Sequence, residues 1–398
     1  MALSRPLTAL AVCMVTSAAD HDRHERLAYA FRLSLSAKAV IGAERSVDIL
    51  LGLLIYVAWS HQIQARVQLY QHLCLLAGMA ADLEQERQPQ QVGVEQTIRS
   101  ELDRAILGSY FLCSFVSVQG LEKCCPMPWT DSLRRCAESV ATIGETSTDR
   151  ELVPLLEIAR ALNDMEPILH VSAETSISSA RYELAAKAAS HRLKALKRSY
   201  PQLASSLTFS AITVEVQYRQ SEYGNSSDSA TAIIECACTI KEFIDDLLSR
   251  PPAYVHQMSL VEWTCLLRVA TLLVEVAEPK SRASSWETDA LMSMLQPKQT
   301  LDKLYAHAAS APAGDQLAPR SEGLLRKLRE LIDRLKRVLM ATTIGPAKDG
   351  RFRPGNEARV AMADRPLPYQ PDELPRRPET LFRGGVLEDE FWNGLTNR

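Results

Sequence analysis

Apolar residues recur every three or four positions along most of the chain, which is the spacing of one face of an α-helix. Short polar or proline-containing breaks separate the periodic segments. Ser46 and Thr130 stand where N-caps are expected, and Asp149 is expected to cap a further helix with Glu151 in its first turn. The pattern predicts helices over approximately 7–18, 23–41, 46–61, 63–84, 97–119, 129–143, 149–169, 174–199, 228–249, 257–277, 285–296, 299–309 and 320–341.

One further segment lacks clear helical spacing. Residues 205–220 are rich in β-branched side chains, which by propensity alone favour a strand. We expect a helix there as well, because a lone strand in a helical protein has no partner. The chain is therefore expected to be all-α, with one large helical domain over 1–312, a linker and a basic amphipathic helix over 313–342, and a mostly disordered, proline-containing tail over 343–398.

Two runs are apolar enough to raise the question of a membrane. Residues 49–59 and 106–118 carry no charge, but a spanning helix needs about 20 mostly apolar residues. Polar residues interrupt or close both runs too early, so we expect buried core helices and no membrane partner. Residues 1–19 imitate a secretory signal; an ordinary first helix after Pro6 is the preferred interpretation.

Charge and cysteine spacing narrow the picture. The chain of 398 residues has a formal net charge of −3, so no global charge attracts it to nucleic acid. Its nine cysteines are irregularly spaced and contain no Cys-x2-Cys pair, which is the usual mark of a structural zinc site. We interpret them as free thiols in the core, as expected in a reducing compartment.

Candidate catalytic motifs are incomplete. The sequence has no glycine-rich phosphate loop and no Gly-x-Ser-x-Gly motif. Asp245 and Asp246 lack the later acid that a magnesium–diphosphate site of an isoprenoid synthase needs. His21 and His24 share a helix face, but two imidazoles without a third ligand make a weak metal site. We expect no catalytic, cofactor-binding or metal-binding residue and no enzyme activity; an unrecognised helical enzyme is the alternative.

Five short motifs follow one another in the first half of the chain. They are an apolar helix over 46–61 with Trp59 near its end, Leu-Ala-x-Met-Ala-x-x-Leu at 76–83, Arg-x-x-Leu-Gly-x-Tyr at 104–110, Trp-Thr at 129–130 and Asp-Arg at 149–150. Their order resembles the helical regulatory region (middle homology region) of fungal zinc-cluster transcription factors. The resemblance covers about residues 7–170 and implies an all-helical, nuclear regulator of transcription.

The chain departs from this family in one respect. The family's DNA-binding module is a six-cysteine cluster around two zinc ions, and the sequence contains no such cluster. The resemblance therefore leaves three interpretations open: a sequence truncated before its zinc cluster, a regulatory domain separated from its DNA-binding module, or a regulator that works through partners. The third is the preferred one, with the transcription machinery or other regulators as partners and a small effector as the sensed ligand. Contact with DNA would be indirect or weak. A secreted helical protein remains a further alternative.

Two segments are candidates for partner contact. The helix over 320–341 carries an apolar seam with coiled-coil spacing, surrounded by basic residues. It is interpreted either as a homo- or heterodimer helix, DNA-backbone contact or nuclear-import signal, or as a terminal domain helix with a solvated basic face. In the tail, two aromatics between acids suit an activation-type segment, or they dock back on the domain. The predicted contact residues are Leu324, Leu328, Leu331, Leu335, Phe391 and Trp392.

Overall fold

The regular structure in the described part of the chain is all helical, as the periodicity predicts. Each regular element in it is an α-helix, a 3₁₀ turn or a π-helical turn, which confirms the all-α fold class. Residues beyond 343, the predicted tail, lie outside it. The computed structural model describes residues 5–17, 20–59, 66–86, 95–121, 123–169, 179–224, 226–277, 285–310 and 319–343.

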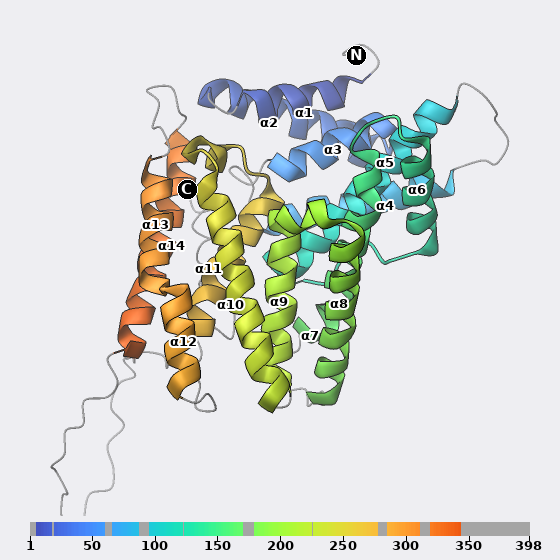
Figure 1. Cartoon of the computed structure of the whole chain (residues 1–398). Helices are drawn as coiled ribbons and strands as arrows, with labels where there is room; N and C mark the ends of the chain where they lie inside the picture. The colour runs from blue at the N-terminus through green and yellow to red at the C-terminus, as the bar shows by residue number, and fades with distance from the viewer. Residues whose placement is uncertain are drawn as a thin grey trace, which may run out of the picture.

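The N-terminal half of the chain starts with helices that lie across one end of the molecule (Figure 1). Glycine lets the first of them approach the third closely: a Cβ on Gly52 would lie 3.0 Å from the backbone carbonyl carbon of Leu7. The elements of this half are α1 (Pro6–Thr16), α2 (His21–Leu35), η1 (Ser36–Ile41), α3 (Val47–Trp59), α4 (Arg66–Gln85), α5 (Glu95–Phe115), η2 (Val116–Gly120), α6 (Asp131–Ile143), η3 (Asp149–Glu151) and α7 (Leu152–Leu169).

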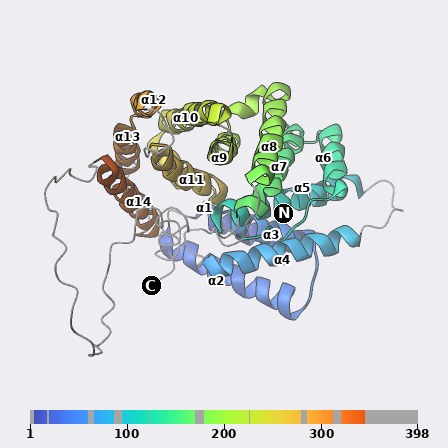
Figure 2. The same cartoon turned by 90° about the horizontal axis from the view of Figure 1, so that it is seen from below.

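The C-terminal half consists mainly of longer helices that run side by side with α7 (Figure 1). Seen from below, α9 stands among α8, α10 and α11 (Figure 2), and it packs against all three. The elements of this half are α8 (Ser179–Ser199), η4 (Pro201–Ser205), α9 (Leu207–Tyr223), α10 (Ser226–Ser249), η5 (Pro252–His256), α11 (Leu260–Ala277), α12 (Ser285–Leu295), α13 (Pro297–Ser310) and α14 (Pro319–Thr343).

The segment with strand-like composition forms the central helix α9, so the helix prediction for 205–220 is confirmed. Twelve of its 17 residues are buried. A helix surrounded by other helices needs no single apolar stripe, which explains why its sequence shows little helical periodicity. Packing on all sides outweighs the modest helix propensity of its β-branched residues. Its neighbour α11 is buried along its length, except at Glu262 and Arg268.

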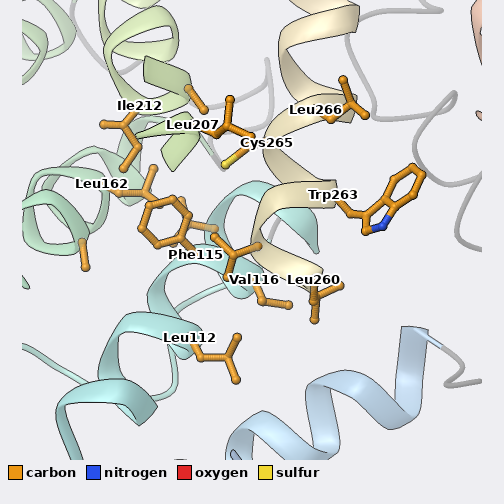
Figure 3. Close-up of a cluster of buried hydrophobic side chains, with 14 of the residues drawn as sticks. Leu112, Phe115, Val116, Leu162, Leu207, Ile212, Leu260, Trp263, Cys265 and Leu266 are labelled. Atoms are coloured by element: carbon orange, nitrogen blue, oxygen red, sulfur yellow. The ribbon is translucent and has the colours of Figure 1, made fainter. Parts of the chain in front are cut away.

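The two halves share one core. Side chains from α5, α7, α9 and α11 gather in a single cluster (Figure 3). Phe115, Leu162, Ile212 and Cys265 come from these four helices, and each is 0% exposed. The cluster joins elements from residue 112 to residue 266 into one packed unit.

Two of the predicted helix starts are confirmed in detail. The Leu133 amide donates to the Thr130 hydroxyl oxygen over 3.3 Å, and the Ile49 amide donates to the Ser46 hydroxyl oxygen over 3.3 Å. The most apolar run of the sequence forms α3, a helix of 13 residues. Among the described helices, none combines the length and apolarity required to span a membrane.

Candidate functional site

The leucine seam of the last helix is buried inside the domain. α14 packs along α13 and α11, and Leu328, Leu331 and Leu335 are 3%, 4% and 0% exposed. The helix is amphipathic, as predicted, but its apolar face covers the core of its own chain. These three leucines therefore do not form a free partner surface. The side chain of Leu324 lies outside the described residues.

The basic face of α14 is only partly engaged by the domain. Lys336 Nζ of α14 lies 2.7 Å from the Asp302 carboxylate of α13, which adds an ion pair to the docking of the helix. Arg326 and Arg337 are exposed, so part of the basic face remains open to a partner. Phe391 and Trp392 lie outside the described residues, and their role stays a prediction.

The histidine pair and the cysteines do not form a metal site in the described part of the chain, where no three His, Cys, Asp or Glu side chains are placed to hold an ion. The imidazole Nδ1 of His24 lies 2.8 Å from the carbonyl oxygen of Met14. All nine cysteines are free. Their assignment to the core is right for four of them, Cys113, Cys136, Cys236 and Cys265, which are buried. It was wrong for the four that are exposed, Cys13, Cys74, Cys124 and Cys238, and Cys125 is half-buried.

The Arg-x-x-Leu-Gly-x-Tyr and Asp-Arg motifs are joined by an ion pair. Arg104 donates from Nε and Nη2 to the two carboxylate oxygens of Asp149, both over 2.8 Å. The Asp149 carboxylate also accepts from the Thr146 amide over 2.9 Å. These hydrogen bonds, those from Arg104 first, hold the pKa of Asp149 well below its usual range although the group is buried. The predicted helix cap at Asp149 is thus wrong, because its carboxylate faces back toward α5 and the preceding turn.

A second contact joins the Trp-Thr motif to the same helix. The rings of Tyr110 and Trp129 meet edge to face, with centroids 5.7 Å apart. The Arg160 guanidinium of α7 lies 4.5 Å from the centre of the Trp129 ring. Asn163 Nδ2 donates to the Tyr110 hydroxyl oxygen over 2.9 Å. Three of the five motifs therefore meet at the junction of α5, α6 and α7, where they hold the architecture together.

A cleft of about 310 Å³ opens between α8 and α10, with α9 as its floor. This volume lies at the lower end of the range for small-molecule sites. Leu193, Phe209, Val216 and Ile234 contribute apolar surface. Lysines from α8 and glutamates from α10 line it as well. The combination of an apolar surface and a few charged groups is typical of a site for a small amphipathic ligand.

Polar side chains cross-link the floor of the cleft to its α10 wall. Gln217 Nε2 donates to Glu235 over 3.3 Å, and the Thr239 hydroxyl donates to Gln217 Oε1 over 3.2 Å. Glu235 also pairs with Lys194 Nζ of α8 over 3.4 Å. One acid of the cleft is thus already neutralised and hydrogen-bonded, and no histidine is among the residues that line the cleft.

Two ion pairs set the register between the walls. Lys187 Nζ lies 3.6 Å from Asp228, and Lys194 Nζ lies 3.4 Å from Glu235. In both pairs the acid on α10 follows the lysine on α8 by 41 positions. α8 and α10 therefore run in the same direction, each antiparallel to α9 between them, as short connections between successive helices require.

The series of ion pairs ends inside the cleft, with Lys194 and Glu235. The same register places Cys238, an uncharged residue, opposite Lys197. Glu242 lies one helical turn beyond Cys238. Lys197 and Glu242 both line the cleft, and within the described residues neither forms an ion pair. The cleft therefore presents one unpaired cation and one unpaired carboxylate.

A buried charge network fixes the floor helix to α11. Arg268 donates to the two Glu215 carboxylate oxygens over 2.6 and 3.1 Å, and Arg219 Nε donates over 3.0 Å. Burial alone would raise the pKa of Glu215, but the two arginines outweigh it and lower the pKa to about 2. Glu275 of α11 lies beside the same arginines, and burial raises its pKa.

Sequence reasoning missed both the cleft and this network. A signal for the network exists, since Glu215 and Arg219 stand four positions apart in a helix of which most residues are buried. Their partner Arg268 is 53 positions away from Glu215, and no local pattern announces it. In the sequence, the lysines and glutamates of the cleft look the same as other charged residues on exposed helix faces.

Comparisons with known proteins found no family model, no curated protein and no solved structure that matches the chain. The α8–α10 cleft and the junction of the motifs are the two features described above. Of these two features the cleft is the one with open volume, whereas at the junction Arg104 already pairs with Asp149 and Tyr110 with Asn163 Nδ2.

Proposed function

We propose that the chain is the regulatory domain of a nuclear transcription regulator of the fungal zinc-cluster type. It acts through protein partners and responds to a small effector bound between α8 and α10. The ordered motifs support the family, and the contacts Arg104–Asp149 and Tyr110–Trp129 give three of them a shared structural role.

The observation that carries the proposal is the chemistry of the cleft. It offers apolar surface and two unpaired charged groups, a binding site without an evident acid–base or nucleophilic set. Its floor helix α9 is tied to α11 through Glu215 and Arg268, and α11 in turn packs against α14. A ligand that shifts α9 would act on the centre of the domain and on the helix with the exposed basic face.

The proposal is tested by tethering the full chain to an unrelated DNA-binding domain upstream of a reporter gene. A changed reporter level, relative to the DNA-binding domain alone, is the expected result. An expressed, nuclear fusion that leaves the reporter unchanged contradicts it. The untethered chain with a fluorescent tag is expected in the nucleus, and its secretion or cytoplasmic retention would contradict that part of the proposal.

A further inference from the structure

We propose that the α8–α10 cleft binds a zwitterionic small molecule with an apolar body, such as an amino acid. Lys197 takes its carboxylate, Glu242 takes its ammonium group, and the apolar part lies against Phe209. The inference deepens the proposed function and rests on it for the role of the ligand. The binding itself is a property of the cleft.

The first argument is the interrupted series of ion pairs between the two walls. Lys187–Asp228 and Lys194–Glu235 bridge α8 and α10 at an interval of seven residues on each helix. The next position at this interval has Glu242 on α10 but Pro201, beyond the end of α8, on the other side. Lys197 comes only three residues after Lys194, and the same offset of 41 places it opposite Cys238. A carboxylate supplied by a ligand completes the missing contact of Lys197. The anionic group of a ligand thus fits beside Lys197, which has no acid opposite it on α10.

The second argument is the charge balance of the lining. The cleft contains two lysines, Lys194 and Lys197, and two glutamates, Glu235 and Glu242. A cleft without net charge does not favour a phosphorylated or otherwise multiply charged ligand, which needs a cluster of basic groups. Lys194 and Glu235 neutralise each other. The two remaining groups have opposite charge, so a ligand with one positive and one negative group matches them.

The third argument is the position of the two groups along the helices. In the register of the ion pairs, Glu242 lies four residues beyond the position opposite Lys197, about 6 Å along the helix axis. Both side chains are long and lie on exposed helix positions, so each adjusts to its partner group. The two ends of one small molecule are therefore sufficient to engage both groups.

The fourth argument is the surface between the charges. Phe209, Val216 and Leu193 come from the floor and the α8 wall, and Ile234 comes from the α10 wall, where it is 39% exposed. Apolar surface next to charged groups favours a ligand that carries a hydrocarbon part in addition to its charges. At about 310 Å³ the cleft accommodates a molecule of amino-acid size.

The test is calorimetric titration of the purified full chain with L-leucine, L-phenylalanine, 4-aminobutyrate and 6-aminohexanoate. At least one of them is expected to bind. Its N-acetyl and methyl-ester derivatives, which each lack one charge, are expected to bind about tenfold more weakly, the loss for one charged hydrogen bond in a partly open site. Absence of binding by all four probes, or equal binding of a zwitterion and both derivatives, overturns the inference.

Two variants assign the charges. Lys197→Gln weakens binding of the zwitterion about tenfold but leaves the methyl ester unaffected, because the ester has no carboxylate to lose. Glu242→Gln does the same for the zwitterion and leaves the N-acetyl derivative unaffected. Arg198→Gln, at the exposed position next to Lys197, is the control and leaves binding unchanged. If both cleft variants bind like the control, the site is wrongly assigned.

The binding and reporter experiments separate the inference from the proposed function. Binding of a zwitterion by a chain that leaves the tethered reporter unchanged supports the inference and contradicts the proposed function. A reporter response without binding of any probe contradicts the inference and supports the proposed function.

Discussion

Arg104 and Asp149 lie 45 positions apart in sequence, yet they share two parallel hydrogen bonds of 2.8 Å. Asp149 is 1% exposed, whereas Arg104 reaches it from a half-buried position on α5. This contact places the turn before α7 against the middle of α5. It also connects two of the motifs on which the resemblance to a transcription-factor region depends.

Removal of the Arg104 guanidinium is expected to destabilise the fold strongly. In Arg104→Met the buried Asp149 carboxylate loses its cationic partner, and the free energy of unfolding falls by about 3–5 kcal/mol. Arg150→Met alters an exposed arginine nearby and changes stability by less than about 0.5 kcal/mol. Urea unfolding followed by circular dichroism measures both. Equal stability of the two variants contradicts a stabilising role for the pair.

Acid is expected to lower the free energy of unfolding through protonation of Glu215. Its pKa is lowered from an ordinary 4.5 to about 2 in the folded state, so the folded state binds its proton less readily than the unfolded state. The stabilisation is fully present above pH 4.5 and is lost as the pH falls toward about 2. In Glu215→Gln, stability at neutral pH is lower and its pH dependence between these values is reduced. An unchanged pH profile contradicts the assignment.

The contribution of Glu275 to the pH dependence of stability has the opposite sign to that of Glu215. Burial raises the pKa of Glu275, so the folded state prefers the protonated group and its ionisation destabilises the fold as the pH rises above the unfolded pKa. Glu275→Gln removes that charge and is expected to raise the free energy of unfolding at pH 7. The gain should disappear in acid, where the wild-type carboxyl is protonated in both states. Urea unfolding of both proteins at neutral and acid pH gives the comparison, and destabilisation at pH 7 is the contrary result.

Substitutions in α14 test whether its leucines stabilise the domain itself or an interface with a partner. Leu335 is 0% exposed, and Leu335→Ala is expected to lower the free energy of unfolding by about 2–5 kcal/mol. Arg337→Ala, on the exposed face of the same helix, is the matched control and has little effect. Urea unfolding is combined with sedimentation measurements of oligomeric state. Loss of a dimer without loss of monomer stability in Leu335→Ala would restore the dimer-seam interpretation.

Local signals in the sequence predicted the helices but not what covers them. The cap at Thr130 and the amphipathic pattern of the last helix involve residues a few positions apart, so they are visible in sequence. The spacing of Leu328 and Leu335 shows that they share a face; it does not say whether a partner or the domain covers that face. Their burial became evident only with the tertiary structure.

The site was less predictable than the fold for the same physical reason. The cleft exists because α8 and α10 stand apart over α9, and its charges come from separate helices. Lys197 and Glu242 look like solvated positions in sequence, since their significance comes from the missing acid at Cys238. Contacts such as Glu215–Arg268, between residues 53 positions apart, leave no periodic trace.

The central claim is that this domain regulates transcription through the α8–α10 cleft. The most direct test is the tethered reporter with a blocked cleft: Ile234→Trp places an indole over the apolar surface, while Leu184→Trp adds one at an exposed position of α8 that does not line the cleft. We predict that the wild-type and Leu184→Trp fusions change the reporter level equally. The Ile234→Trp fusion, whose cleft no longer accepts an effector, is expected to give a different reporter level. A reporter that responds identically in all three fusions, at equal expression, would contradict the account.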